Sequence, residues 1–381
     1  SRFKALRRRP SIAMMLMSKL APTNVQTASL WGAVALVALP VASGLLRKLF
    51  GEVGDQNIAS FFALLWRYRS TDIQSFMKSH REAYKRGKET GDFVPGVCNY
   101  YTLMSDLITL ASGPYWHFVP MHRNLSRAAC HHKYHEDLTR YLEAKQGDTI
   151  LEIGSGYGEM GRQVAKLSGA SVTSLTMADA EIVGGNERIK AAGLEGRCKM
   201  IQGNYHDLPM GANTFDKVFG VYTLKYSADL EKAFSEAARV LKPGGKFVSY
   251  EILVTDKYDS TQKLQKYYVD NISSSTCMPP LWHAEDFRKA AKKAGLVPCQ
   301  EDDLCAGTDA WYSCFERTGV YHLLSSSAVY GLLRFAEMLR ILPTNFAEFY
   351  DYCIVHPATD FVNAGRLGIV TGSVMMTWTK P

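Results

Sequence analysis

A glycine-rich loop at residues 152–158 carries the strongest chemical signal in the sequence. It reads EIGSGYG and lies between an apolar run typical of a strand and a run typical of a helix. Glycines let the chain turn tightly there and let a ligand approach the backbone. Dinucleotide enzymes share this spacing, but the acidic Glu152 opposes a phosphate and can accept a hydrogen bond from a cationic amine. We therefore expect S-adenosylmethionine, with Glu152 on its methionine amine and a cradle formed by Gly154, Ser155, Gly156 and Gly158.

Further cofactor contacts are expected where the later strands end, because ligands gather at that edge of an open α/β sheet. Thr176 can hydrogen-bond a ribose hydroxyl and Met177 can pack on adenine, although no acidic residue follows this strand. The side-chain oxygen of Asn204 can accept from the adenine amine, and the backbone N–H of Tyr205 can meet a ring nitrogen. Tyr222 follows the fourth strand, where the methyl donor should face its acceptor.

These residues need strands to position them, and the pattern from residue 147 onward predicts parallel βαβ units. Strands are expected at 149–153, 171–176, 198–202, 215–222 and 246–251. Helices are expected at 131–145, 160–167, 180–192, 230–240, 284–294 and 332–342, and a last pair of strands around a turn within 365–380. The predicted fold class is α/β, a doubly wound Rossmann-like sheet with a helical N-terminal extension.

Four segments follow from this pattern. Residues 1–50 are a basic start with an apolar run, 51–130 a helical and aromatic cap, 131–259 the cofactor-binding core, and 260–381 a C-terminal region that completes the sheet. Of the 381 residues, 46% are apolar and 21% charged, so the chain can bury a sizeable core.

The start of the chain predicts a membrane anchor. Residues 28–46 contain no charge, and Arg47 and Lys48 follow at once. Nineteen residues nearly span a bilayer core of about 30 Å, although a buried or interfacial helix is the alternative. The net charge of +7 includes five basic residues among the first nine, which fits a membrane surface better than nucleic acid. We expect a membrane-associated protein of the endoplasmic reticulum, with its catalytic domain in the cytosol.

No metal site is predicted from the sequence. The eight cysteines form no CxxC pair and no ligand spacing, which predicts reduced thiols in a cytosolic compartment. His131, His132 and His135 lie close together in the sequence, but no carboxylate or thiolate stands at a suitable spacing. We therefore expect them on the surface of a helix.

The motifs together resemble the sterol methyltransferase family over residues 92–381. The resemblance rests on NYYTLMSDLITLASGPYWHF at 99–118, LEIGSGYG, NYHDLPMGANTFDKVFGVYTLKY, RVLKPGGKFVSYE, VTDKYD and the closing GRLGIVTGSVMMTWTKP. It implies a class I methyltransferase that transfers a methyl group from S-adenosylmethionine to a sterol carbon. The cofactor loop is common to many methyltransferases, whereas VTDKYD and the closing segment are more specific.

One departure from the family indicates which carbon is methylated. The carbon-24 enzymes carry an acidic residue after the fourth strand, where a carboxylate would stabilise a side-chain carbocation. Here residues 222–226 read YTLKY, without a carboxylate, and with RILP at 340–343 they resemble the sterol 4-C-methyltransferase branch. The resemblance therefore implies methylation at carbon 4 of a 3-oxo or 3-hydroxy sterol.

Methylation at carbon 4 through an enolate needs a base and a donor to the 3-oxygen. The candidate catalytic residues are Tyr101, His117, Tyr222, Lys225 and Glu251, with Tyr100 as a further candidate. Each candidate also has a structural alternative. The tyrosines can line the pocket, and His117 can be a packed ring. Lys225 can be a solvated cation, and Glu251 can be a cap. Three other functions stay open: carbon-24 methylation, methylation of another lipid or amine such as phosphoethanolamine, and lipid binding without turnover. The oligomeric state stays open as well, a homo-oligomer included.

Overall fold

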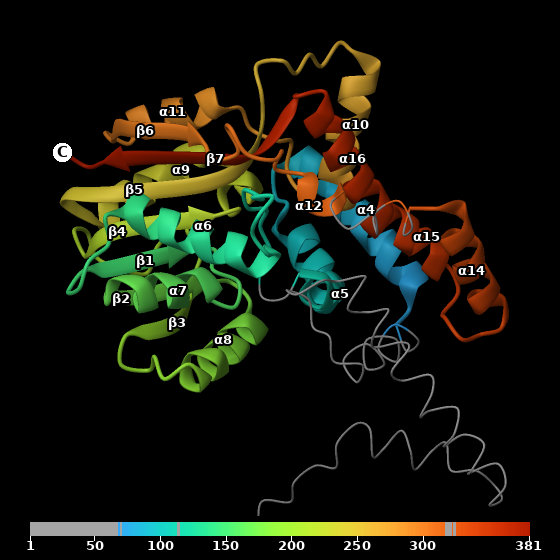
Figure 1. Cartoon of the computed structure of the whole chain (residues 1–381), viewed down its shortest axis with the longest axis horizontal. Coiled ribbons are helices and arrows are strands. Elements are labelled where there is room, and N and C mark those ends of the chain that lie inside the picture. Colours follow the sequence, from blue (N-terminus) through green and yellow to red (C-terminus); the bar gives the residue numbers. More distant parts are fainter. Residues whose placement is uncertain (1–67, 69–70, 113–114, 317–321, 323–324) are drawn as a thin grey trace, which may run out of the picture.

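The computed structural model describes residues 68, 71–112, 115–316, 322 and 325–381 (Figure 1). It contains a seven-stranded sheet in the order β3-β2-β1-β4-β5-β7-β6. The strands are β1 (Thr149–Ile153), β2 (Ser171–Thr176), β3 (Cys198–Gln202), β4 (Phe215–Val221), β5 (Leu241–Val254), β6 (Val297–Asp303) and β7 (Val370–Thr379). The first five strands are parallel, and β7 is antiparallel to both of its neighbours. The predicted doubly wound α/β sheet is confirmed.

Helices cover both faces of the sheet, as the alternating pattern predicts. One face carries α6 (Arg127–Leu142), α7 (Glu159–Ser168) and α8 (Asp179–Ala191), and the other carries α9 (Leu230–Val240) and α11 (Ala284–Lys293). Aromatic packing fixes the second face, where the Phe234 ring lies 5.2 Å from the Phe247 ring and 5.0 Å from the Trp378 ring. Burying one such side chain contributes about 1.5–3 kcal/mol. This packing holds α9 against β5 and β7.

The C-terminal part of the sheet differs from the prediction. Residues 365–380 form the end of α16 (His356–Arg366) and then the single strand β7, not a pair of strands. Gly372 resembles a turn residue but lies inside β7, where a Cβ would come within 2.7 Å of Trp311 and 2.9 Å of the Tyr222 hydroxyl. The edge strand β6 reads VPCQEDD, which lacks the apolar residues that would have revealed it.

Two other boundaries also differ from the prediction. β5 begins at Leu241, so residues 242–245, expected as the turn after a helix, belong to a strand. Helix α14 (Ser327–Met338) starts five residues earlier than expected, because the Ser326 side chain accepts a hydrogen bond from the backbone N–H of Val329 and caps it.

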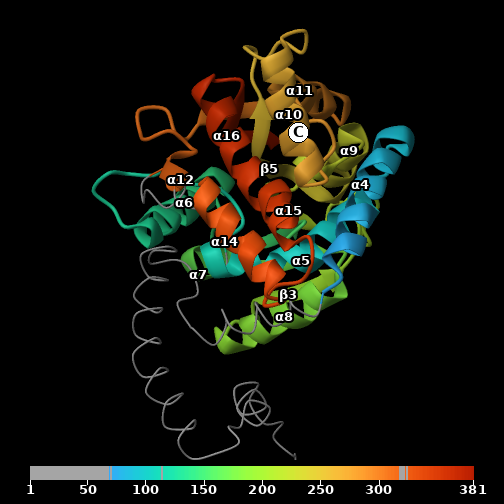
Figure 2. The ribbon, with the colours of Figure 1, turned by 90° about the vertical axis from the view of Figure 1, so that its right-hand side faces the viewer.

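A cap of helices covers the carboxyl edge of the parallel strands (Figure 1). The first part of the chain contributes α4 (Ile73–Thr90) and α5 (Val94–Ser112). The last part contributes α10 (Lys263–Ser275), α14, α15 (Phe346–Tyr350), the π-helical turn η2 (Asp351–Val355) and α16. Figure 2 shows α4, α5, α14 and α15 close together, and Met77, Tyr100, Phe349 and Cys353 share one apolar core. Two segments far apart in the sequence therefore form one cap.

The predicted membrane anchor at residues 28–46 lies outside the described residues. Among the residues that the structure describes, no helix is long and apolar enough to cross a membrane. Helix α14 and the residues after it expose a row of large apolar side chains, each more than half exposed: Leu332, Phe335, Met338, Leu339 and Ile341.

Candidate active site

The glycine-rich loop lies between β1 and α7 at the edge beneath the cap. Gly154, Gly156 and Gly158 have φ angles of +60°, +53° and +68°, a region that other residues adopt only at a cost. A Cβ on Gly154 would lie 2.3 Å from the Thr223 side chain, whereas one on Gly156 would meet only Trp116, at 3.9 Å. Gly154 is therefore needed to pack the loop against the end of β4, and Gly156 keeps the loop surface open for a ligand.

Glu152 is a buried carboxylate beneath this loop. Its Oε2 accepts hydrogen bonds from the Ser174 hydroxyl at 2.6 Å and from the Gly161 N–H at 3.1 Å. Burial raises the pKa of Glu152 to about 7, although these bonds and Arg162 oppose the rise. Since both bonds end on Oε2, Oε1 can accept from a cationic amine. The residue fits the methionine amine of the cofactor, and this contact stays a prediction.

A carboxylate from the helix after β2 reaches the end of that strand, where no acidic residue stands directly. Thr176 donates a hydrogen bond to Glu181, which projects from the first turn of α8, at 2.5 Å. Burial raises the pKa of Glu181. Sequence reasoning missed this residue because only the helix geometry brings it back over the strand end. Thr176 and Glu181 together can hold two ribose hydroxyls, while Met177 lies partly exposed beside them.

Asn204 is engaged in the turn after β3. Its Oδ1 accepts from the backbone N–H of His206 at 2.9 Å and lies 3.1 Å from the ring Nδ1 of that residue. The side-chain oxygen of Asn204, which we expected to accept from the adenine amine, thus already has two polar contacts with His206. The Tyr205 ring beside it is buried and lies 4.6 Å from the His206 ring. The adenine contacts of Asn204 and Tyr205 stay predictions.

An aromatic wall joins the cap to the cofactor loop. The Tyr101 ring stacks on Trp116 at 5.4 Å, and Trp116 meets the Tyr157 ring of the loop edge-on at 5.6 Å. The Tyr101 hydroxyl lies 2.7 Å from the Tyr226 hydroxyl. Burial raises the pKa of Tyr101 to about 12, so its hydroxyl stays protonated at neutral pH. Tyr100 instead packs in the apolar core of the cap, which favours its structural alternative over a catalytic role. Trp116 was not singled out from the sequence.

Tyr222 and Lys225 lie at the end of β4, facing this wall. Tyr222 has a φ angle of +53°, donates to the carbonyl of Gly372, and stacks on Tyr250 at 5.5 Å. The Lys225 ammonium nitrogen lies 4.7 Å from the centre of the Tyr222 ring and 4.9 Å from that of Tyr226. Burial lowers the pKa of Lys225 and nearby Glu251 opposes this shift. The amine is held between two aromatic rings, which favour its charged form.

Glu251 fixes the YTLKY run rather than facing a substrate. Its Oε1 accepts from the backbone N–H of Leu224 at 2.8 Å and of Thr223 at 3.2 Å, and its Oε2 from that of Lys225 at 3.3 Å. It therefore closes the 3-10 turn η1 (Leu224–Tyr226). The sequence offered a cap as the structural alternative for Glu251, and the contacts support one, at the turn after β4.

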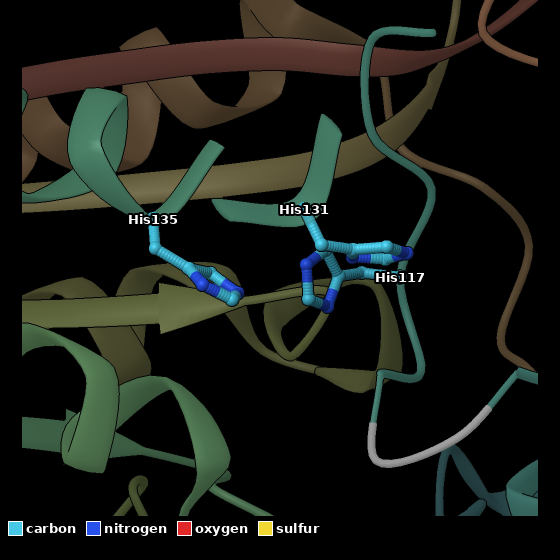
Figure 3. Close-up of side chains that lie close together, drawn as sticks. All are labelled: His117, His131 and His135. Carbon is cyan, nitrogen blue, oxygen red and sulfur yellow. The ribbon is translucent and has the colours of Figure 1, made fainter. Parts of the chain in front are cut away.

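The prediction that His131, His132 and His135 lie on a helix surface is wrong for two of the three. His131 and His135 are both 2% exposed, on the inner side of α6, and only His132 faces outward. His117 joins them from the segment before α6 (Figure 3). One ring nitrogen from each of His117, His131 and His135 lies within 4.8 Å of the others. The sequence showed the spacing within α6 but not that a third ring would reach it.

Comparisons with known proteins show the family and the fold of the chain. A methyltransferase-domain family matches residues 151–249. Sterol 4-C-methyltransferase strm-1 of Caenorhabditis elegans is 31% identical over 332 residues, 84% of this chain and 97% of that protein. The 24-methylenesterol C-methyltransferase 2 of Oryza sativa subsp. japonica is 27% identical over 78% of this chain and 83% of its own. The structure of geranyl diphosphate C-methyltransferase from Streptomyces coelicolor A3(2) has a TM-score of 0.54 at 16% identity, over 70% of this chain and 90% of its own, and so shares the fold.

The sheet, the glycine loop and these matches define a class I methyltransferase that uses S-adenosylmethionine. The chain belongs to the sterol methyltransferase family, and it is a sterol C-methyltransferase.

The raised pKa of Glu152 predicts a pH dependence of cofactor binding. Only the ionised carboxylate can pair with the methionine ammonium, so affinity for S-adenosylhomocysteine should fall as the pH drops below about 7. Glu152→Gln should weaken binding about ten- to a hundredfold at pH 8 and remove this pH dependence. Calorimetry across pH 6 to 8 measures both effects. If the variant keeps the wild-type affinity, Glu152 does not contact the amine.

Glu181 is predicted to hold the cofactor ribose. Glu181→Gln should weaken binding of S-adenosylhomocysteine about tenfold or more, because a charge-assisted hydrogen bond is lost. Glu187→Gln is the matched control, since Glu187 lies exposed on the same helix. Equal affinities of the two variants in calorimetry would contradict the assignment.

Proposed function

We propose that this enzyme methylates carbon 4 of a 3-oxo sterol. The proposal rests above all on the charge pattern at the end of β4. The only carboxylate among the residues described above that reaches the YTLKY run is Glu251, and its oxygens are turned to backbone N–H groups. The polar groups at this place are the buried amine of Lys225 and the paired hydroxyls of Tyr101 and Tyr226. Such groups suit a reaction that develops negative charge on oxygen better than one that develops a carbocation.

Forming an enolate needs a donor to the 3-oxygen and a base at carbon 4, and different residues can supply them. The hydroxyls of Tyr101 and Tyr226 share one hydrogen bond, so one of them keeps an O–H to donate to the 3-oxygen. Lys225, whose pKa burial lowers, can take the proton from carbon 4 in its neutral form. When bound, the cofactor supplies a methyl group on a sulfonium, which a carbon nucleophile can attack. Trp116 and Tyr157 pack edge-on beside the glycine loop and would cover the bound cofactor on that side.

The two relatives named above agree with a sterol acceptor, but their names cover both carbons. The carbon-4 enzyme matches at higher identity and over nearly its whole length, whereas the carbon-24 relative matches at lower identity. Carbon-24 methylation is therefore the second candidate. Methylation of another lipid or amine, and binding without turnover, are outcomes that the same assay would detect.

Substrate selection tests the proposal. With labelled cofactor, the purified enzyme should methylate a 3-oxo sterol with a saturated side chain, and faster than its 3-alcohol, because only the ketone gives an enolate. Mass spectrometry should place the methyl group at carbon 4. Methylation restricted to sterols with a side-chain double bond, with the product at carbon 24, would overturn the subtype and the mechanism.

A variant pair tests the base within the same assay. Lys225→Met should lower the rate constant by about 10²- to 10⁴-fold, while Lys232→Met, an exposed change on α9, should not. The wild-type rate should rise with pH and level off below the ordinary pKa of lysine, because burial lowers the pKa of Lys225. A pH profile of Lys225→Met that keeps this rise would assign it to another group.

We also propose that the enzyme works at a membrane surface, that of the endoplasmic reticulum, with its catalytic domain in the cytosol. Two features support this location. The uncharged run at 28–46 is followed by basic residues, and the row of exposed apolar side chains on α14 has Arg334 and Arg340 beside it. A sterol acceptor is itself dissolved in lipid, so both features would bring the cap to its substrate.

Membrane sedimentation tests this location. Removing the residues before Gly51 should release most of the protein without unfolding the core. Changing Leu332, Phe335 and Met338 to Ser in the shortened chain should release the rest, because the apolar surface is lost. A shortened chain with the three serines that still sediments with membranes would show that another surface binds them.

A further inference from the structure

Three histidine rings from two segments meet beneath the cap, beside the sterol site (Figure 3). His131 and His135 are one turn apart on α6, which places both side chains on the same face. His117 reaches them from the strand-like segment that leads into α6, and its ring lies 5.6 Å from the His131 ring. One nitrogen of each ring lies within 4.8 Å of the other two. No other group of this kind occurs in the part of the chain that the structure describes.

One ring nitrogen of each histidine has no hydrogen-bond partner among the residues that the structure describes. His117 Nε2, His131 Nδ1 and His135 Nε2 are buried and make no hydrogen bond among the described residues. The hydroxyl of Tyr134 is also buried and makes no hydrogen bond among the described residues, and its ring lies 4.8 Å from that of His117. A buried polar atom left unpaired costs free energy, so several in one place point to a ligand that satisfies them together.

The surroundings keep the three rings neutral. Burial lowers the pKa of all three histidines, and neighbouring histidines add to the effect. Lys225 faces His117, Arg127 faces His131, and Glu159 faces His135. Neutral imidazole is the form that binds metal ions. The Tyr115 ring stacks on His131 at 4.1 Å and shields the cluster.

We propose that His117, His131 and His135 form a binding site for a divalent transition-metal ion of the zinc class. Three histidines with one open position are a known ligand set for Zn²⁺, with Zn–N distances of about 2.0–2.1 Å. To reach these distances, each ring nitrogen must move toward the centre of the cluster by about 1 Å. Rotation of the side chains can provide this movement. Imidazole ligands without a thiolate or carboxylate select Zn²⁺, Cu²⁺ or Ni²⁺ over Mg²⁺ and Ca²⁺. The fourth position is left for water.

The site lies close to the methyl-transfer site but is separate from it. The His117 ring lies 6.2 Å from the Tyr222 ring, whose hydroxyl is directed to Gly372. A metal ion there would tie the segment carrying Trp116 and His117 to α6, and so fix one wall of the acceptor pocket. The inference does not depend on which sterol carbon is methylated.

Cobalt binding to the full chain tests the proposal. After removal of metals with a chelator, the wild-type protein should bind one Co²⁺ per chain, with the strong visible absorption of a four- or five-coordinate ion. His131→Asn and His117→Gln should each weaken binding by at least about 100-fold, because one of three protein ligands is lost. His132→Asn is the matched control, since His132 is the exposed neighbour on the same helix.

The results separate the proposal from its alternatives. Wild-type protein that gives only the weak absorption of hydrated Co²⁺ overturns it, and this readout needs no variant to fold. An equal loss of binding in His132→Asn and His131→Asn would also overturn it. Circular dichroism and S-adenosylhomocysteine binding check that each variant is folded. Zinc retained at one ion per chain during purification, and lost in His117→Gln, would support the site independently.

Discussion

The active site depends on one buried carboxylate, that of Glu251. It accepts three backbone N–H groups from the turn after β4 and a fourth hydrogen bond from the Ser249 hydroxyl. This fixes Tyr222 in its left-handed conformation and holds Lys225 between two aromatic rings. Because burial raises the pKa of Glu251, its charge is retained only through these bonds and the nearby amine. The carboxylate is thus used to shape a cationic site, and it does not face the acceptor.

The same principle applies across the site. Glu152, Glu181 and Lys225 are ionisable groups whose pKa values burial shifts toward the neutral form. Each lies where a part of a ligand is expected that it would bind or act on: the methionine amine for Glu152, the ribose for Glu181 and the acceptor carbon for Lys225. Burial therefore weakens the charged states in the free protein, and ligand binding can restore them. Such shifts cluster at functional sites for this reason.

The sequence predicted the parts that local pattern determines. The loop at 152–158 follows an apolar strand, and β1, β2 and β4 are short runs whose residues are mostly buried. It missed β6, since an edge strand with polar residues has no such pattern. It also missed Glu181 and the meeting of His117 with His131, which depend on how distant segments pack. Asn204 was assigned from its position alone, and the turn that occupies its oxygen was not visible.

The order of the strands has a consequence for how the protein is made. β7 lies between β5 and β6, although it follows both of them in the chain. Until the ribosome has released Val370–Thr379, β5 presents an unpaired edge and β6 has no neighbour to pair with. The cap cannot close earlier either, because α15 and α16 also come late. From the synthesis of β5 until that of β7, the nascent chain thus carries an open sheet edge, a state in which aggregation competes with folding.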